Sequence, residues 1–593
     1  MDICSLPVQT ACAFLRQRVL CVIALATLAG WTGPAGATIL LPPALEGPSY
    51  QLTLQTGSWQ FRPGTNSATM GVNGPVLGPT LIMEQGEDVS LFLENQLGTT
   101  TTIHWHGMHV SPENDGGPHT VIAPGATWNP QFTVLDKAGT YWYHPHLHAN
   151  TNLHASRGIA GFVIVRDAEE AALDLPRTYG VDDFPLAIQT KTIDEIGQII
   201  VPSNADSVLM VNATVNAELA VPGQVVRLRL LNGSSMRTFN LGLEDNSNFQ
   251  MIASDGGLLG SPLALTRLQL SPGERAEILV NFANYTGSLA LMSYASELPN
   301  GVNGAFQPGM MPQQVLTGYN PNPMNGTDFQ VMRFNIGAQS ENPVLTIPGE
   351  LVPQTPLPES QADTLRQFLL TPMTPGPNAL NGHFLINGSE FDMGVINETI
   401  MLGATEIWSI TNQSPIAHPF HIHDVQFYVL DLNGAPPLPA LSGRKDVILV
   451  PPMQTVRFIT QFLDHASSTV PYMYHCHMLI HEDAGMMGQF LVIDPSASLA
   501  PQAGLPGSLI LQPAFPNPFN PDTVLGVVVS QAQHASLGIF NLLGQEVARL
   551  HEGLLGTGEH SFRLDGSTLA SGVYIVRLQG DSELLQQKVL LCK

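Results

Sequence analysis

Histidine clustering constrains the fold of this chain more than any other feature of its sequence. Ten of the 19 histidines fall into four short clusters, and each cluster contains a His-x-His pair. In a β-strand, residues i and i+2 point to the same face, so each pair can present two imidazoles to one metal site. The clusters are His104-Trp105-His106-Gly107, His144-Pro145-His146, His418-Pro419-Phe420-His421-Ile422-His423 and His475-Cys476-His477-Met478-Leu479-Ile480-His481. Because two clusters lie early and two lie late, a shared site requires the fold to join both parts of the chain.

The composition is typical of a multidomain, all-β protein. A length of 593 residues is too great for one ordinary domain and suggests roughly three to five. The chain has 55 glycines, 47 prolines and 12% charged residues, and long helical periodicity is hard to find. These features favour short strands joined by turns. A formal net charge of −25 makes nucleic acid an unfavourable partner, because both surfaces would be negative.

The first 37 residues have the pattern of a secretory signal peptide. Arg16 and Arg18 precede an apolar run over 19–29, which is too short to span a bilayer, and Ala35-Gly36-Ala37 provides a small-residue cleavage site. Gln17 separates the two arginines, so the sequence does not support a twin-arginine signal. No later run is long and apolar enough for a membrane span. We therefore expect an exported protein without a membrane span in its mature chain.

Strand-like segments separated by turn residues divide the rest of the chain into blocks. Three apolar strands end in asparagine, at Asn95, Asn232 and Asn412, which indicates a repeated sandwich domain. The predicted organisation is a signal peptide at 1–37, β domains at 45–167, 175–335 and 375–495, a Pro-rich connector at 336–374, a linker at 496–508 and a final β domain at 509–593.

Cys476 is the one cysteine with a sequence context that indicates chemistry. Three of the five cysteines lie in the predicted signal peptide, so the mature chain keeps Cys476 and Cys592 and is no disulfide scaffold. If His475 and His477 face one side of a strand, Cys476 faces the other side. The thiolate of Cys476, two imidazoles and a thioether form the ligand set of a blue-copper electron-transfer centre. The remaining members of this predicted set are His418, His481 and Met486.

The four clusters resemble the copper signatures of the multicopper oxidases, in the forms HWHG, YWYHPH, HPFHIH and HCHMLIHEDAGMM. The resemblance covers about residues 45 to 495 and is closest to the bacterial laccase and cuprous oxidase branch. It implies three cupredoxin-like Greek-key β-sandwich domains, four copper ions and dioxygen as electron acceptor. By the family's pattern, His418, Cys476, His481 and Met486 hold the type 1 copper, His104 and His421 the type 2 copper, and His106, His144, His146, His423, His475 and His477 the type 3 pair.

Two carboxylates resemble the family's acids near the oxygen site. They are Asp115, which follows Asn114 in a turn-like segment, and Glu482, which follows His481. Reduction of dioxygen to water consumes protons, so a positioned acid beside the cluster is chemically required. A turn or capping role is the structural alternative for each. The other nearby histidines are expected outside the ligand set, which is already full: His109, His119, His148 and His154.

The identity of the reducing substrate stays open between two donors. The first hypothesis is a laccase-like oxidase of phenols or similar organic donors, and the second is a Cu(I) oxidase in copper tolerance. Cuprous oxidases of the family often carry a Met-rich insert, whereas the connector here holds only Met373, and Met310, Met311 and Met324 form no dense array. This favours the phenolic donor. A third hypothesis is a non-catalytic binding or assembly protein, but such relatives lose ligands and none is missing here.

The end of the chain resembles the C-terminal sorting domain of type IX secretion cargo. The resemblance covers about residues 509 to 593 and depends on the Asn-Pro-Phe-Asn-Pro segment at 517–521 and on the strand-like segments at 541–547 and 570–578. It implies a small β-sandwich that an outer-membrane secretion machinery recognises. Export would then proceed through the periplasm to the cell surface or the medium. An ordinary adhesion-like β domain is the alternative.

Overall fold

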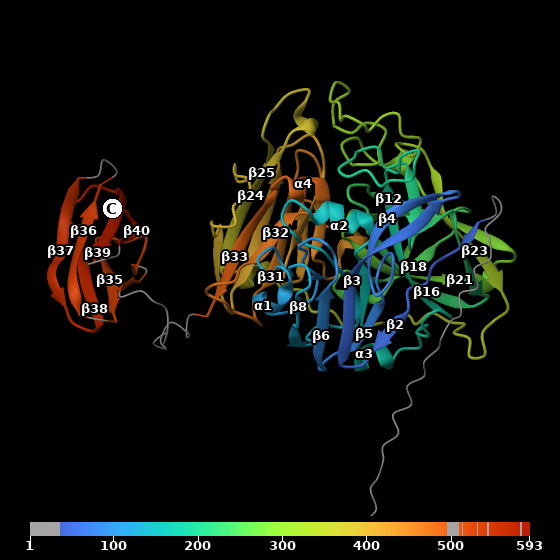
Figure 1. Ribbon diagram of the computed structural model, residues 1–593, viewed down its shortest axis with the longest axis horizontal. Helices are drawn as coiled ribbons and strands as arrows, with labels where there is room; N and C mark the ends of the chain where they lie inside the picture. Colours follow the sequence, from blue (N-terminus) through green and yellow to red (C-terminus); the bar gives the residue numbers. More distant parts are fainter. Residues whose placement is uncertain (1–35, 495–508, 513, 531, 542–544, 581–583) are drawn as a thin grey trace, which may run out of the picture. The chain divides into compact units, whose positions relative to one another are not determined.

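The computed structural model describes residues 36–494, 509–512, 514–530, 532–541, 545–580 and 584–593 (Figure 1). The chain forms two compact units, Met1–Pro495 and Ser496–Lys593. Almost all of the predicted signal peptide and the whole predicted linker lie outside the described residues. The described secondary structure is dominated by strands, which confirms the predicted all-β class. Within the described residues, none of the helices has the length and apolar character needed to cross a bilayer.

The first domain is a sandwich of two sheets around an apolar core. Alternation along β6 (Asp88–Asn95), with buried Val89, Leu91 and Leu93, directs every second side chain into this core. One sheet has the order β2 (Ala44–Glu46), β5 (Thr80–Glu84), β11 (Gly161–Arg166), β10 (Gly139–His144) and β7 (His104–His106). The other has the order β4 (Thr65–Val72), β3 (Ser49–Arg62), β6 (Asp88–Asn95) and β8 (Thr127–Trp128), with β9 (Gln131–Thr133) also on β6.

The second domain is a larger sandwich whose central strands are buried on both faces. Its first sheet has the order β14 (Thr214–Val215), β13 (Val208–Val211), β12 (Asp183–Lys191), β16 (Val225–Asn232), β21 (Arg275–Asn281), β18 (Phe249–Ser254) and β19 (Gly257–Leu265). Its second sheet has the order β1 (Ala37–Thr38), β15 (Ala217–Pro222), β23 (Phe329–Gly337), β22 (Ser288–Ser293), β17 (Phe239–Leu243) and β20 (Leu268–Leu270). Strand β1 precedes the first domain but pairs with β15, so the start of the described chain belongs to the second sandwich.

The third domain supplies the late histidine clusters. One sheet has the order β25 (Phe384–Ile386), β24 (Thr364–Pro372), β27 (Thr405–Asn412), β31 (Thr455–Gln461) and β29 (Phe427–Leu432). The other has the order β26 (Glu398–Met401), β33 (Met487–Ile493), β32 (Tyr472–Cys476), β28 (His418–Ile422) and β30 (Val447–Val450). Strand β24 lies inside the predicted connector at 336–374. That prediction was too long, because the prolines around β24 obscured the pairing of this strand with β27.

The repeated asparagine has the same structural role in all three sandwiches. Asn95, Asn232 and Asn412 end β6, β16 and β27, and each is fully buried. In each case Nδ2 donates to at least two backbone carbonyls, and Oδ1 accepts from the amide two residues later. The amide side chain thus satisfies the backbone where the strand ends and the chain turns.

The C-terminal unit is a small sandwich of three and four strands. The first sheet has the order β34 (Leu509–Leu511), β35 (Asp522–Val529) and β38 (Gly558–Asp565). The second has the order β37 (Glu546–Leu555), β36 (Gln533–Phe540), β39 (Gly572–Gln579) and β40 (Leu584–Leu591). Alternating residues such as Leu537, Ile539 and Val576 fill its core. This fold agrees with the small β-sandwich that the sequence predicted.

Candidate metal centres

Strand register brings the histidine clusters together in pairs. In the first domain β7 pairs with β10, so that His104 lies opposite His144. In the third domain β28 pairs with β32, so that His421 lies opposite His475. The His104 and His421 rings lie 6.0 Å apart between centroids, which joins the early and late clusters in one buried site.

One group of three imidazoles points at a single position. The Nε2 atoms of His146, His423 and His475 lie 3.1, 3.2 and 3.4 Å from one another. The Nδ1 of His423 lies 2.8 Å from Oδ2 of Asp115, which fixes the orientation of that ring. These three nitrogens cannot all be hydrogen-bonded to one another, because a neutral imidazole has a single N–H and each ring nitrogen either donates or accepts. Their convergence is the arrangement expected of metal ligands.

A second group of imidazoles faces the first. The Nδ1 of His106 lies 3.4 Å from Nε2 of His144, and the His477 ring is 4.9 Å from His106 and 5.4 Å from His144 between centroids. Both ring nitrogens of His477 are buried without a hydrogen-bond partner among the described residues. His477 therefore has unused nitrogens beside His106 and His144, whose facing nitrogens contact each other.

The remaining two histidines, His104 and His421, converge with His423 in a third group. The Nδ1 of His104 donates to the Asp115 carbonyl at 3.0 Å, and the Nδ1 of His421 donates to the Asp446 carbonyl at 2.8 Å. With the proton on Nδ1, each Nε2 carries a lone pair. Both Nε2 atoms are buried and have no hydrogen-bond partner in the described part of the chain.

Cys476 and two further histidines form a separate site on the other face of β32. Its Sγ lies 3.5 Å from Nδ1 of His418 and 3.6 Å from Nδ1 of His481. Phe384 packs on both imidazole rings, and Met486 lies fully buried in the same apolar cluster as Cys476. The sulfur of Cys476 and the imidazole of His475 thus point to opposite sides of one strand, as the alternation predicted.

The electrostatics of both sites suit a bound cation. Burial lowers the pKa of every ligand histidine for which a shift is resolved; for His423 it falls to about 4, and for His477 and His481 to about 3. Neutral imidazole is the form that binds a metal. Burial also raises the pKa of the Cys476 thiol, so a thiolate there needs a positive partner. Imidazole and thiolate donors suit copper, and the residues present therefore fit this metal.

The two predicted acids lie beside these imidazoles, and their pKa values are shifted in opposite directions. Burial would raise the pKa of Asp115, but hydrogen bonding and charge from His423 and His104 hold it well below its usual range. Burial and the neighbouring Asp483 raise the pKa of Glu482 well above its usual range. The Glu482 oxygens lie 3.5 Å from Nδ1 of His146 and 3.4 Å from Nδ1 of His475. Their surroundings thus shift the pKa of Asp115 downward and the pKa of Glu482 upward.

The four histidines expected outside the ligand set have other partners or positions. His109 pairs with Asp136 at 2.7 Å, and His119 contacts Gln489 Oε1 at 2.7 Å. His154 contacts the Thr101 hydroxyl at 3.0 Å, and the His148 ring packs on Phe391. None of the four belongs to the groups of residues whose ligand atoms converge.

Sequence reasoning missed an ion pair that supports the site. Arg275 of the second domain donates to both carboxylate oxygens of Asp446 at 2.6 Å. Asp446 Oδ1 also lies 3.1 Å from Nε2 of His106, and its carbonyl accepts from His421. Neither residue has a local motif, and their contacts join positions far apart in the sequence. Arg275 and Asp446 could therefore be identified only once the fold was known.

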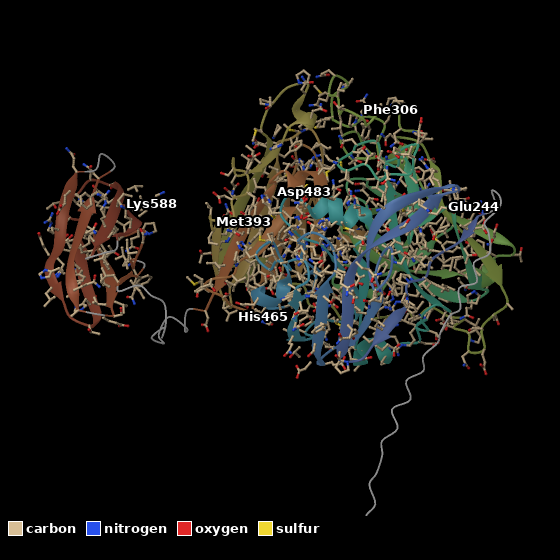
Figure 2. The ribbon with its side chains drawn as sticks, in the orientation of Figure 1. Glu244, Phe306, Met393, His465, Asp483 and Lys588 are labelled. Carbon is tan, nitrogen blue, oxygen red and sulfur yellow. The ribbon has the colours of Figure 1, made fainter. Side chains whose placement is uncertain are left out.

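A cleft of about 910 Å³ lies over the cysteine site. His481, 6% exposed, forms part of its floor, whereas His418 is fully buried. Asp483 also lines the cleft and accepts from the backbone amides of Thr151 and Asn152, which attaches α4 (Leu479–Asp483) to α2 (Thr151–Arg157) (Figure 2). A reducing substrate in this cleft, called the donor cleft below, would approach the cysteine site through His481.

Comparisons with known proteins agree with this geometry. Models described as multicopper oxidase match residues 53–170, 185–310 and 360–496, and a model described as secretion system C-terminal sorting domain matches residues 513–592. A multicopper oxidase of Staphylococcus epidermidis is 33% identical over 75% of this chain and 88% of its own length. The chain belongs to the multicopper oxidase family.

Other relatives show the range of proteins that share this family's fold. The cell division protein FtsP of Xenorhabdus nematophila is 32% identical over 77% of this chain and 92% of its own length. The solved structure of a bacterial laccase-like multi-copper oxidase from Ochrobactrum sp., described as active towards lignin model compounds and lignosulfonate, has a TM-score of 0.67. It is 36% identical and covers 77% of this chain and all of its own. As a multicopper oxidase, this protein binds copper, and its C-terminal unit is a sorting domain.

Proposed function

We propose that this multicopper oxidase is laccase-like and couples the one-electron oxidation of phenolic or similar donors to the reduction of dioxygen to water. The observation that carries the proposal is the convergence of nine imidazoles and Cys476 into two sites joined through one strand, with the His477 ring beside His106. Four copper ions would be held, with type 1 at His418, Cys476, His481 and Met486, type 2 at His104 and His421, and the type 3 pair at His106, His144, His146, His423, His475 and His477.

Copper would supply the electron storage and the transfer to dioxygen that no side chain can provide. The chain supplies the path between the sites, because Cys476 is bonded through the backbone to His475 and His477. His481 at the floor of the cleft is the entry point for electrons. The apolar side chains around Cys476 exclude water from the cysteine site.

Asp115 and Glu482 have different parts in the proposed reaction. Asp115 remains anionic and holds His104 and His423 in fixed tautomers through its hydrogen bonds. Glu482 holds a proton at its carboxyl beside His146 and His475. A protonated buried acid at this position can deliver the protons that water formation consumes.

The alternatives to a phenolic donor are tested by two measurements. Copper per chain in the fully metallated protein should approach four, and oxygen uptake should be faster with a diphenol than with Cu(I) at matched concentrations. A preference for Cu(I) would instead establish the cuprous oxidase. A protein with one copper or none and no oxygen uptake would match the non-catalytic alternative, which the relation to cell division proteins keeps open.

We also propose that the sorting domain directs this oxidase through the periplasm to the cell surface or the medium. The support is the match of residues 513–592 to secretion sorting domains, together with the signal-peptide pattern at residues 1–37. Deletion of residues 496–593 should retain the protein in the periplasm of its own cell. Unchanged export of the truncated chain would contradict this proposal.

A further inference from the structure

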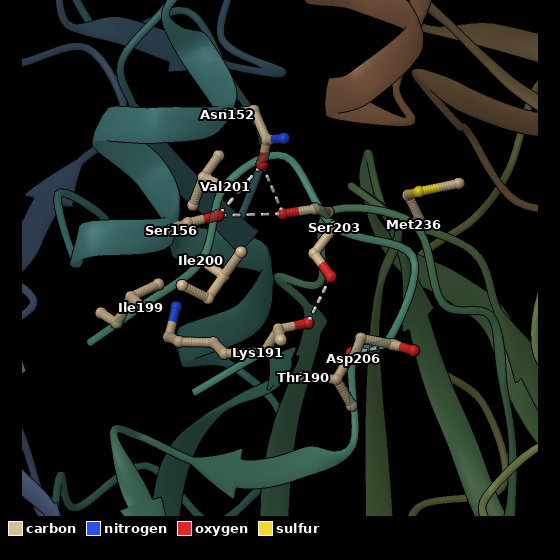
Figure 3. Close-up of a pocket in the computed structure, with 12 residues that line it drawn as sticks. Asn152, Ser156, Thr190, Lys191, Ile199, Ile200, Val201, Ser203, Asp206 and Met236 are labelled. Carbon is tan, nitrogen blue, oxygen red and sulfur yellow. Dashed lines mark hydrogen bonds between the residues drawn. The ribbon is translucent and has the colours of Figure 1, made fainter. Parts of the chain in front are cut away.

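A small cavity at the edge of the donor cleft contains a buried lysine without a partner (Figure 3). Lys191 ends β12, and only 6% of its surface is exposed. Its ammonium makes no hydrogen bond or ion pair with any residue that the structure describes, and it lies beside Ile199 and Ile200. Burial lowers the pKa of Lys191 to about 8, so at neutral pH the side chain remains largely charged. A buried charge of this kind normally requires a partner.

The acidic residue at the cavity is already neutralised. Asp206 accepts from Nε of Arg237 at 2.7 Å and from Nη2 of Arg237 at 2.6 Å, one bond to each carboxylate oxygen. The same oxygens accept from the Thr190 hydroxyl and the Asn322 amide. One carboxylate is thus matched by one guanidinium. The ammonium of Lys191 therefore remains an uncompensated positive charge at this cavity.

Ser203 adds a second hydrogen-bond donor to the same cavity. Its Oγ accepts from the Thr192 hydroxyl at 2.8 Å and from the Ala205 amide at 3.1 Å, which leaves its own proton to donate. The other cavity hydroxyls have no proton to spare, because Ser156 and Ser235 both donate to Oδ1 of Asn152. Ser203 thus offers a donor elsewhere on the lining, and the ammonium of Lys191, which has no partner among the described residues, selects a negatively charged acceptor as its occupant.

The size of the cavity limits that occupant to a small group. Its volume is about 20 Å³, enough for about one water-sized ion or group. Four residues line both this cavity and the donor cleft, namely Asn152, Val201, Ser203 and Met236. We propose that Lys191 binds one monovalent anionic group at the edge of the donor cleft. Its source is either a free ion such as chloride or the carboxylate of a bound donor, and the second source rests on the proposed function.

Chloride dependence of stability tests the site without any reference to activity. The copper-loaded chain, Lys191→Met and Lys191→Gln are compared in chloride and in gluconate, an anion too large for the cavity, at equal ionic strength. The matched control is Lys137→Met, since Lys137 is exposed and paired with Glu169. We expect saturating chloride to raise the Tm of the parent chain and of Lys137→Met by about 3 °C, and to leave both Lys191 variants unchanged. A bromide peak beside Lys191 in soaked crystals should accompany this shift.

Two donors that differ only in charge distinguish the sources of the anion. Oxygen uptake is measured in gluconate with a hydroxycinnamic acid and with its methyl ester. A donor carboxylate at Lys191 gives the acid a KM about tenfold below that of the ester, and Lys191→Met abolishes the difference. If the ratio of the acid KM to the ester KM is the same in the parent chain and in Lys191→Met, and chloride still raises the Tm of the parent chain, the bound anion is a free ion. No chloride effect, no bromide peak and no acid preference would overturn the site, whereas loss of all oxygen uptake would contradict only the proposed function.

Discussion

Asp446 connects the second domain to the imidazoles of both the early and the late clusters. Its carboxylate holds Arg275 and His106, and its carbonyl holds His421. Asp446→Asn replaces one oxygen of the Arg275 pair by an N–H donor and leaves the buried guanidinium with Asp255, at 3.7 Å, as its remaining carboxylate partner. We expect loss of most type 2 and type 3 copper with retention of the blue type 1 site. Copper per chain and electron paramagnetic resonance measure the two outcomes separately.

A similar pair elsewhere in the third domain provides the control. Asp431 pairs with Arg457 at 2.7 Å, but Arg457 is partly exposed and the pair is remote from the histidines. Asp431→Asn should therefore keep the full copper content. Equal copper loss in both variants would show that Asp446 has only a general stabilising role.

Cys476 determines whether the two metal sites communicate. Cys476→Ser replaces the thiolate with a hydroxyl, which is a poor copper ligand. The intense blue thiolate-to-copper absorption should disappear, and steady-state oxygen uptake should fall by at least about a hundredfold, while circular dichroism remains that of the folded β protein. Persistence of the blue colour would refute the type 1 assignment.

At the scale of elements, the repeated asparagines support the ends of three equivalent strands. Asn232→Ala removes two bonds to backbone carbonyls and one from the Ser234 amide, all of them buried. Unsatisfied buried groups of this kind should lower the free energy of unfolding by about 2–4 kcal/mol. Guanidinium unfolding measures the loss. Asn284→Ala, at an exposed position of the same domain, should change stability by less than about 0.5 kcal/mol.

The sequence predicted those elements whose signal is local. Alternation identified strands such as β6, and the i, i+2 spacing correctly placed Cys476 and His475 on opposite faces of β32. The connector was misjudged because β24 is recognisable only by its pairing with β27. Arg275 and Asp446 could not be predicted for the same reason, since their positions depend on how separate sandwiches pack. Local patterns thus predicted the clustered histidines and Cys476, whereas only tertiary packing places Arg275 and Asp446 beside them.

At the scale of the whole molecule, a buried ion network joins the first and second domains. Its buried part has three arginines and three carboxylates, and the half-exposed Arg177 adds a fourth guanidinium at Glu170; the six buried residues are Arg166, Glu170, Asp183, Arg227, Arg229 and Glu277. Glu277 lies two residues after Arg275 on β21, so the two side chains emerge from the same face. One strand therefore carries both this network and Arg275, whose partner Asp446 contacts His421 of the third domain.

This arrangement predicts that damage at the network reaches the copper site. Glu277→Gln leaves Arg227 and Arg229 with an excess buried positive charge, which should cost about 3–5 kcal/mol of stability. A shift of β21 would also displace Arg275 from Asp446, so type 2 and type 3 copper should fall together with the unfolding midpoint. The double variant Arg227→Met, Glu277→Met removes one charge of each sign and should be more stable than either single variant. If the double variant is instead as unstable as the sum of both single variants, the network does not act as a balanced unit, and the coupling through β21 is absent.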